Sequence, residues 1–450
     1  MSHTAPNRIL LLVRTRIAWL SLLALGATAQ EPLTLKDAVR QALGHHPALD
    51  AAAARVQASE ARIGQARSGR LPRVQYMESF QSGNNPVYVF GSLLTQRQFT
   101  SANFSLDPLN RPDPLNNFQS QVVADQLVYD FGGLKNGIRA AEIGKQMTEQ
   151  EKKSAELMLV AGVARAYHGV SLAIQALEVA KSALLAAETD QKRAETVRSA
   201  GMATDADVLS VQVHVAMMRE QVIRRTADVQ IGQAALNEAI GLPLDTPHQL
   251  TTPLTPVVGL AVGETVARPE LQQLRLARNA ADAQALSARA GYLPQIGLHG
   301  VLEADRQNFA TKGGGNWLLM ASLKWNVFDG GRTKENVAEA KAMSAVAQAS
   351  ERQFASAFQL EVRKARAEFE SATERINVTE ATIAQAEESL RILRNRYTNG
   401  LATITDLLRA QTAALDAKMR RLAAIHDQRL AALDVERAAG ILNGDSNVLQ

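Results

Sequence analysis

The sequence has no cysteine, and this absence excludes several functions. Without a thiol, the chain has no disulfide framework, no cysteine zinc site, no cysteine nucleophile and no cysteine for N-terminal lipidation. Aromatic residues are also scarce, at 4%, whereas hydrophobic residues reach 46% and are mostly alanine and leucine. This composition favours long, closely packed helices over a compact globular core.

Strong charge of one sign and catalytic motifs are missing as well. The formal net charge is +4, and it falls to +1 once three arginines near the start (Arg8, Arg14 and Arg16) are set aside. No basic stripe with interleaved aromatics indicates a nucleic-acid partner. Gly-x-Ser-x-Gly and His-x-x-x-His patterns are absent, and the adjacent His45 and His46 point to different helix faces. We therefore expect no enzyme activity, no cofactor, no metal and no nucleic acid.

Residues 1–29 have the pattern of a signal peptide. The arginines precede an apolar run at 17–25, which is well short of the roughly 20 residues that a membrane-spanning helix needs. Ala27-Thr28-Ala29 then fits a cleavage site, with a mitochondrial-type presequence or a weak anchor as the alternative. No later apolar run is long enough to span a bilayer, so we expect a periplasmic protein, a secreted protein or a β-barrel.

Proline is absent from two long stretches, between Pro114 and Pro243 and after Pro294. Because proline interrupts helical hydrogen bonding, these stretches allow very long helices. Apolar residues recur in them at alternating steps of three and four, which predicts a supercoiled helical seam. The two series are Val163, Ala166, Val170, Ala173, Leu177, Ala180, Leu184 and Ala187, and Val362, Ala365, Phe369, Ala372, Ile376, Thr379, Ile383 and Ala386.

The helix lengths follow from glycines at both ends of each stretch. Residues 133–199 and 332–398 each predict a 67-residue helix, about 100 Å long at ~1.5 Å per residue. Gly201 and Gly400 then fit helix ends with tight reversals. Four shorter helices are predicted at 35–68, 203–240, 268–291 and 402–440.

The two halves of the chain repeat one another. Three pairs of similar segments occur in the same order, namely 66–72 with 288–294, 128–133 with 327–331, and 201–212 with 400–411. We therefore expect a tandem duplication, with a first repeat at 30–240, a proline-rich linker at 241–267 and a second repeat at 268–450. The first repeat has a longer segment between its Leu71-Pro72 and Gly132-Gly133 motifs, which predicts a long loop.

Between each Leu-Pro and Gly-Gly motif lies a segment that predicts a β-hairpin. Apolar residues occupy every second position at 317–327 and 296–304, and the pattern is weaker at 73–81 and 118–129. Such alternation predicts strands with one apolar and one polar face. Trp317 and Trp325 would then form aromatic girdles at two membrane interfaces. A half-buried hairpin on a soluble sheet is the alternative, but no other domain remains to support one.

Two hairpins supply four strands, which are too few to close a barrel, since about eight strands are the practical minimum. The sequence therefore predicts a cyclic assembly of two or three chains. Together these features predict a mainly α chain of long antiparallel helices with membrane β-hairpins.

The duplicated helix–hairpin–helix plan, the Leu-Pro and Asp-x-Gly-Gly motifs and the Gly-x-x-x-x-x-Asp-[Val/Leu]-Leu reversals resemble the TolC-like outer-membrane efflux proteins over residues 30–445. The resemblance implies a homotrimer with a twelve-stranded β-barrel among outer-membrane lipids and a helical α-barrel across the periplasm. It also implies a periplasmic adaptor that binds the reversals and connects the channel to an inner-membrane pump. A structural coiled-coil protein of the envelope is the alternative function.

The resemblance places candidate site residues at the reversals, 198–209 and 397–408. The expected adaptor-docking residues are Gly201, Met202, Asp207, Leu209, Gly400, Leu401, Asp406 and Leu408. A pore constriction is expected at Tyr397, Asp406 and Arg409, although Ala402 and Arg409 replace the family's arginine and second aspartate. Alternatively, Asp207 and Asp406 cap the following helices, and Tyr397 is a core residue.

Overall fold

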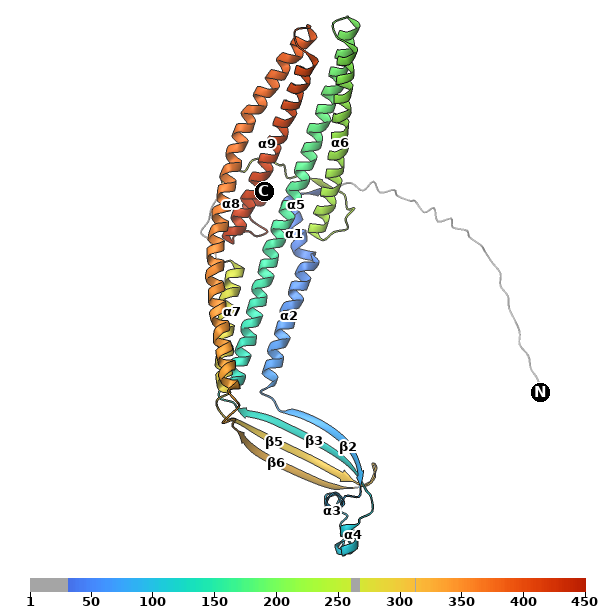
Figure 1. Ribbon diagram of the computed structural model, residues 1–450, viewed down its shortest axis with the longest axis vertical. Helices are drawn as coiled ribbons and strands as arrows, with labels where there is room; N and C mark the ends of the chain where they lie inside the picture. The colour runs from blue at the N-terminus through green and yellow to red at the C-terminus, as the bar shows by residue number, and fades with distance from the viewer. Residues whose placement is uncertain (1–30, 260–267, 312) are drawn as a thin grey trace, which may run out of the picture.

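A computed structural model describes residues 31–259, 268–311 and 313–450. It is a long rod of helices that ends in a four-stranded sheet (Figure 1). The predicted signal peptide at 1–29 and the last part of the predicted linker lie outside the described residues.

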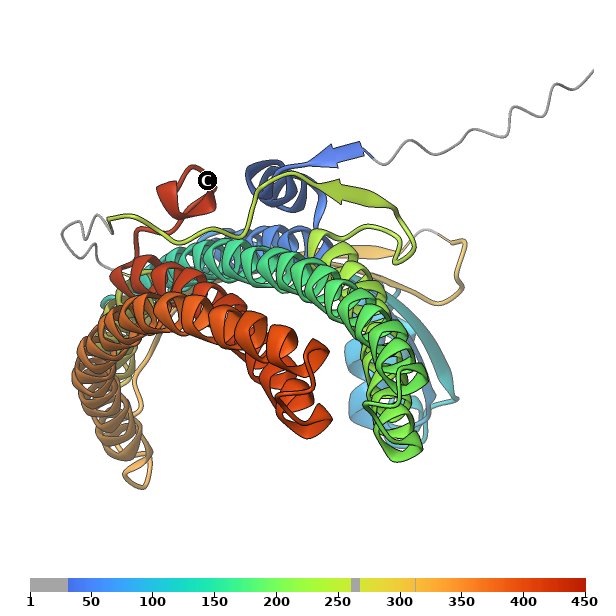
Figure 2. The same cartoon turned by 90° about the horizontal axis from the view of Figure 1, so that it is seen from above.

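Two helices run the full length of the rod, and shorter helices pack along each of them. The rod consists of α1 (Leu35–His45), α2 (Pro47–Ser68), α5 (Gly133–Ser199), α6 (Asp205–Ile240), α7 (Pro269–Ala290), α8 (Arg332–Thr398) and α9 (Ile404–Ala439). Helices α5 and α8 have 67 residues each, as the sequence predicts. In Figure 1, α6 lies beside the upper half of α5 and α2 beside its lower half, while α9 and α7 flank α8 in the same way. Seen from above, the helices form a curved wall with a concave side (Figure 2).

One helix prediction is wrong in detail, because residues 35–68 form two helices instead of one. The break falls at His46, whose extended backbone ends α1 and precedes α2. Pro47 causes it, since proline fits the first turn of a helix but cannot continue one. The Nδ1 atom of His46 accepts a hydrogen bond from the Ala48 amide at 3.1 Å. His46 therefore caps α2, and the described residues contain no cluster of three or more metal-binding side chains.

Another expectation, that no later segment is apolar enough to span a membrane, is also wrong. Helix α5 contains a stretch that meets this test by length and composition. Half of that stretch is buried inside the protein, and α5 supplies Val160, Val163 and Tyr167 to the main core. We interpret α5 as the central helix of the rod.

The main core lies midway along the rod, where α1, α5, α6 and α9 meet. A two-stranded parallel sheet of β1 (Glu31–Leu33) and β4 (His248–Leu250) covers it. The buried Tyr167 hydroxyl donates to the Leu33 carbonyl at 2.8 Å and accepts from the Thr252 amide at 2.9 Å. These bonds attach the segment that follows α6 to the start of the described chain.

The other four strands form one antiparallel sheet in the order β2-β3-β5-β6. They are β2 (Arg73–Gly83), β3 (Leu115–Tyr129), β5 (Gln295–Arg306) and β6 (Gly314–Lys324). The pairing of β3 with β5 joins the two predicted hairpins, one from each repeat, into a continuous surface. A bulge between Leu127 and Tyr129 shifts the register beside the rod.

The register gives the sheet two different faces. The apolar face carries Val74 and Tyr76 of β2, Val122 and Ala124 of β3, Ile296, Leu298 and Leu302 of β5, and Trp317, Leu319 and Leu323 of β6. Toward the end far from the rod, this face also carries Glu78, Ser120 and Arg306, which bond to one another. The opposite face is mostly polar and includes Arg73 and Gln75 of β2, Asn117, Gln121 and Asp125 of β3, His299, Glu303 and Asp305 of β5, and Asn316, Met320 and Ser322 of β6. It also carries Met77, Val123, Val301 and Leu318. Polar side chains bond across the strands on this face, as Gln121 does with Glu303 at 3.0 Å. One apolar and one polar face is the pattern of a sheet between lipid and water.

Candidate functional site at the helix reversals

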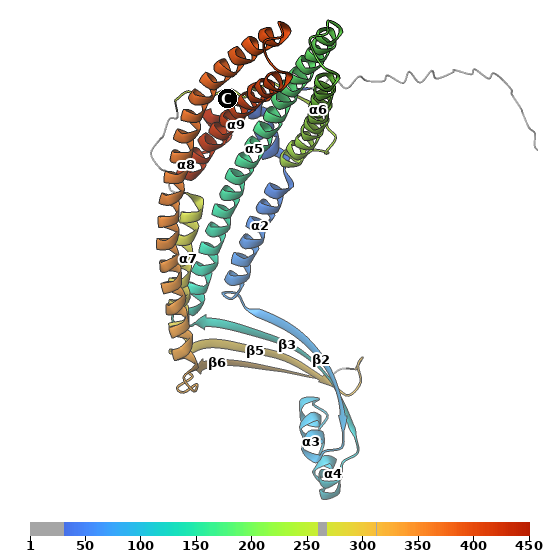
Figure 3. The ribbon, with the colours of Figure 1, turned by 45° about the horizontal axis from the view of Figure 1, so that its top comes forward.

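The two reversals lie at the end of the rod opposite the sheet (Figure 3). Helix α5 turns into α6 through Gly201, and α8 turns into α9 through Gly400. Both glycines have left-handed backbones, with φ of +75° and +71°. The next residue donates its amide back into the preceding helix, from Met202 to Val197 at 3.0 Å and from Leu401 to Arg396 at 2.8 Å. These are the helix-ending motifs that glycine favours.

Each aspartate of the reversals caps the helix that follows. Asp207 accepts from the amide and hydroxyl of Thr204, both at 2.8 Å. Asp406 does the same with Thr403, with the hydroxyl at 2.7 Å. Both are reciprocal capping boxes, which satisfy the free amides of the first turn. The structure therefore shows the capping role of both residues, and a pore-lining role stays a prediction.

The pKa of Asp406 lies below its usual range, first because the carboxylate accepts a hydrogen bond from the Thr403 hydroxyl. The Thr403 backbone amide and the positive charges of Arg409 and Arg396 lower this pKa further. Because this pKa is lower in the folded state, the cap contributes its full stabilisation of the folded state at pH values above the ordinary pKa of an unfolded aspartate. Its contribution is lost as the pH falls through the lowered, folded-state pKa.

We predict that Thr403→Ala loosens the second reversal, because it removes both the side-chain acceptor for the Asp406 amide and a donor to the carboxylate. Loss of such a cap costs about 1 kcal/mol, or roughly a fivefold rise in local amide exchange. Hydrogen exchange of the first turn of α9 measures this rise. The control is Thr412→Ala in the same helix, whose hydroxyl bonds only the Leu408 carbonyl and caps nothing. Equal exchange in both variants would contradict the capping role.

Apolar side chains are exposed at the tip of both reversals. Met202, Leu209 and Leu401 are 58%, 60% and 68% exposed, whereas Leu408 is half-buried against the core of the reversal end. Large exposed apolar residues at matching positions of two repeats indicate a binding surface. Three of the four predicted apolar docking residues are thus accessible in one chain.

Of the predicted constriction residues, the structure places Arg409 beside Asp406 but Tyr397 in the core. Tyr397 is 4% exposed and packs with Val211 and Leu407 from both helix pairs. Its hydroxyl has no hydrogen-bond partner among the described residues. Burial, and then the charges of Asp207 and Asp190, raises the pKa of Tyr397. The core interpretation of Tyr397 is therefore correct for one chain, and its role in a constriction stays a prediction.

A buried charged cluster near the reversals was not predicted from the sequence. Asp190 of α5 is 1% exposed and binds Arg193 at 2.5 Å and Arg394 of α8 at 3.1 Å. It also accepts a hydrogen bond from the side-chain amide of Gln411 in α9. Beside it, burial lowers the pKa of His214 on α6, so that this side chain is neutral at neutral pH. The cluster connects the α5/α6 pair to the α8/α9 pair.

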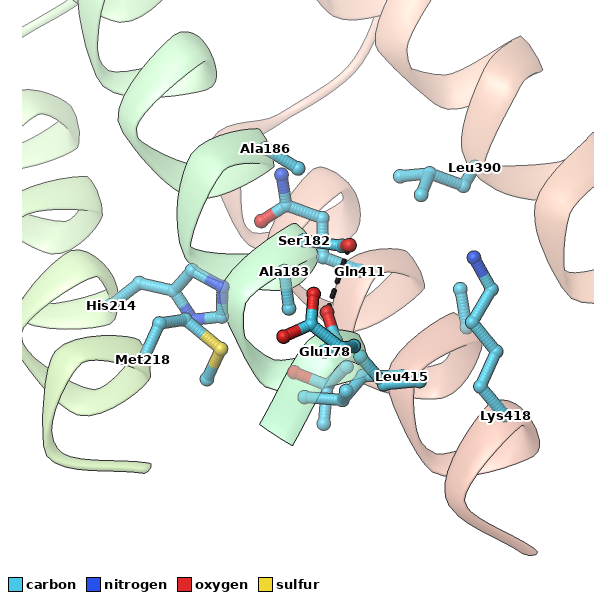
Figure 4. A pocket seen from close by; sticks show the side chains of 13 residues that line it. Glu178, Ser182, Ala183, Ala186, His214, Met218, Leu390, Gln411, Leu415 and Lys418 are labelled. Carbon is cyan, nitrogen blue, oxygen red and sulfur yellow. Dashed lines mark hydrogen bonds between the residues drawn. The ribbon is translucent and has the colours of Figure 1, made fainter. Parts of the chain in front are cut away.

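A cavity of about 270 Å³ separates the two helix pairs next to this cluster. Figure 4 shows His214 and Met218 on one side and Leu390, Leu415 and Lys418 on the other. Protein interiors are otherwise close-packed, so this pocket interrupts the apolar packing between the pairs, which continues through Val211, Tyr397 and Leu407. The Asp190 cluster adds a buried charged attachment to this apolar packing.

The predicted girdle residues lie near the two ends of the sheet. Trp317 is 76% exposed and shares a cross-strand row with Leu302, Val122 and Tyr76 on the apolar face. Trp325 follows the end of β6 beside the rod, not within the strand as predicted, and donates its indole N–H to the Tyr292 carbonyl at 3.0 Å. The girdle role stays a prediction that these positions support.

Comparison with known proteins identifies the relatives of this arrangement. The family described as Outer membrane efflux protein matches residues 38–242 and 265–441. Outer membrane protein OprJ of Pseudomonas aeruginosa is 26% identical over 397 residues, covering 85% of this chain and 79% of OprJ. Cation efflux system protein CusC of Escherichia coli (strain K12) is 23% identical over 391 residues, covering 84% and 80%. The crystal structure of outer membrane protein VceC of Vibrio cholerae matches with a TM-score of 0.76 at 22% identity, covering 90% and 96%.

Long paired helices, a two-faced sheet at one end and exposed reversals at the other define an outer-membrane channel protein. The chain belongs to the outer membrane efflux protein family, whose match covers most of its length. It is the outer-membrane channel component of an efflux system and extends into the periplasm, so the coiled-coil alternative is not supported.

Proposed function

We propose that three copies of the chain form one passive conduit, without a catalytic step, in a tripartite efflux or type I secretion system. Twelve strands would close a barrel in the outer membrane, and the helices would form a tunnel through the periplasm. The two repeats, 30–240 and 268–450, would each contribute one hairpin and one set of helices, joined by the linker 241–267. The observation that carries the proposal is the two-faced sheet with two unpaired edges.

The edges of the sheet support closure by further copies. Strands β2 and β6 each pair on one side only, and they run in opposite directions because the order β2-β3-β5-β6 is antiparallel throughout. The β6 edge of one chain can therefore pair antiparallel with the β2 edge of the next. A barrel also removes exposed edges, which would otherwise promote aggregation.

The helices support the same assembly. Helix α5 has 18 buried residues, whereas α8, of equal length, has five. Apolar side chains remain exposed along α8, with Met343, Val346, Leu360 and Val378 each at least 55% exposed. A helix that buries so little in one chain is expected to pack against another copy.

The length of the rod supports docking at the reversals. A 67-residue helix places them about 100 Å from the sheet, deep in the periplasm when the sheet is in the outer membrane. An adaptor would contact Met202, Leu209 and Leu401 there, and separation of the two helix pairs would open the pore. The adaptor would in turn connect the conduit to an inner-membrane pump.

The matched pair Leu319→Arg and Met320→Arg tests the barrel. These neighbours on β6 are both exposed and apolar but lie on opposite faces of the sheet. An arginine facing lipid costs about 2–4 kcal/mol near the bilayer centre, whereas one facing the lumen is tolerated. We expect Leu319→Arg to deplete heat-resistant trimers from the outer membrane, and Met320→Arg to retain trimers that conduct ions in planar bilayers. Equal insertion of both variants would overturn the proposal.

A further inference from the structure

The connection between β2 and β3 is folded, although a loop was predicted there. It contains α3 (Pro86–Thr95), the 3₁₀ helix η1 (Ser101–Phe104) and α4 (Leu106–Asn110). We call residues 84–114 the insertion. The corresponding connection in the second repeat, from Arg306 to Gly314, is much shorter.

The insertion is attached to the polar face of the sheet. Gln96 is 2% exposed and donates from Nε2 to the Asn117 side chain at 3.0 Å and the Asn116 carbonyl at 2.9 Å. Asn117 donates in turn to Asp305, which is 1% exposed, at 2.7 Å. Although the Gln96 Oε1 atom has no partner among the described residues, this chain of buried hydrogen bonds holds the insertion in one position on the sheet.

Contacts with the remaining strands extend the attachment across the sheet. The Tyr88 hydroxyl donates to the Gln81 carbonyl of β2 at 2.9 Å. The Arg97 guanidinium donates to the Gly315 carbonyl of β6 at 2.7 Å. The insertion therefore contacts β2, β3, β5 and β6, which a mobile surface loop would not do.

The glycine-rich segment at 313–315 is explained by this contact. It lies between β5 and β6, where β6 begins. A Cβ atom on Gly314 would lie 1.8 Å from the Thr95 carbonyl oxygen at the end of α3. Only glycine permits such a close approach of backbones. The glycine at the start of β6 in the second hairpin thus leaves room for the insertion of the first hairpin.

The insertion lies on the concave side of the wall, at the end of the sheet far from the rod (Figures 2 and 3). The insertion carries exposed apolar residues, with Val87, Phe104 and Leu106 at 82%, 67% and 78% exposure. In a barrel whose polar face lines the lumen, an element attached to that face lies over the opening. Lipid cannot reach it there, so the same element of the other copies is the available apolar partner.

We propose that the insertion is an outer cap of the channel. Three copies meet over the mouth of the barrel through Val87, Phe104 and Leu106 and narrow the exit against large polar solutes from outside. This inference rests on the proposed barrel but adds a second barrier, separate from the periplasmic reversals.

Single cysteines test the contact directly, because the natural chain has none. Val87→Cys, Phe104→Cys and Leu106→Cys are oxidised in intact cells, with Leu319→Cys on the apolar face of the sheet as control. The cap predicts disulfide-linked dimers from at least one of the three insertion variants and none from the control. Intact trimers whose three insertion cysteines react with maleimide but never cross-link would overturn the cap.

A deletion tests the barrier independently. Residues 84–114 are replaced by Asn-Gly, a turn that suits a two-residue hairpin, in a chain that carries Met320→Cys on the polar face. The cap predicts that labelling of this cysteine by a bulky polar maleimide outside the cell rises roughly tenfold on deletion. Unchanged labelling in intact trimers would overturn the cap. Failure of the barrel would be seen separately, as absence of trimers from the unmodified protein.

Discussion

The double variant Met202→Asp/Leu401→Asp is expected to abolish export while leaving trimers in the outer membrane. The two residues occupy matching positions in the repeats, one at each reversal, and both are more than half exposed. Burying one large apolar side chain contributes about 1.5–3 kcal/mol to a contact. Each channel would lose six such contacts at once, and each aspartate adds the cost of removing a charge from water.

The stability of the channel should be unaffected, since neither side chain belongs to the core of the reversal end. The measurement combines two readouts in cells, namely the minimal inhibitory concentration of exported compounds and photo-crosslinking to an adaptor from position 209. The control is Val258→Asp, which places the same charge on a 95% exposed apolar residue far from the reversals. Normal export and normal crosslinking by the double variant would show that the adaptor docks elsewhere.

The rod could be predicted from sequence because its determinants are local and periodic. The absence of proline and the three-four spacing together identify both 67-residue helices, and Gly201 and Gly400 mark their ends. The break between α1 and α2 was missed, although Pro47 was a readable indication of a new helix start. The helical spacing is signalled by many positions of the sequence, whereas a break in a helix is signalled by a single residue.

The insertion was predicted as a loop because the first repeat has extra residues between its Leu71-Pro72 and Gly132-Gly133 motifs. Asn85 and Pro86 in fact form a helix start, since the Asn85 side chain accepts from the Val87 amide at 3.0 Å and proline occupies the first turn. This pattern was visible in the sequence. The attachment of Gln96 to Asp305 through Asn117 was not visible in the sequence, because Gln96 and Asn117 belong to the first repeat and Asp305 to the second.

The Asp190 cluster lay beyond sequence analysis for the same reason. Its partners Arg394 and Gln411 are 204 and 221 residues away in the chain. An aspartate in a heptad helix usually lies on the solvent face, and only the packing of two helix pairs buries this one. Long-range polar contacts of this kind require the fold before they can be recognised.

The Asp190→Asn variant is expected to open the periplasmic end of the channel. It leaves Arg193 and Arg394 facing a neutral amide in a largely buried site, which is more costly than replacing the whole cluster. Breaking a buried pair costs about 3–5 kcal/mol, and the lower value applies here because both arginines are partly exposed. The pocket beside His214 and Met218 interrupts the apolar packing between the helix pairs next to this cluster.

Planar-bilayer conductance and hydrogen exchange of Tyr397 and its neighbours measure the opening, and both should rise. Glu388→Gln is the matched control, since it removes the same charge from an exposed pair with Arg391 on α8 and should change neither quantity. The apolar replacement Asp190→Leu/Arg394→Met should restore closure, because it removes the charges of Asp190 and Arg394 together and the remaining Arg193 is partly exposed. If Asp190→Asn conducted like the natural protein, the α5/α6 and α8/α9 pairs would be held together by the apolar packing between them or by contacts between copies, and not by this cluster.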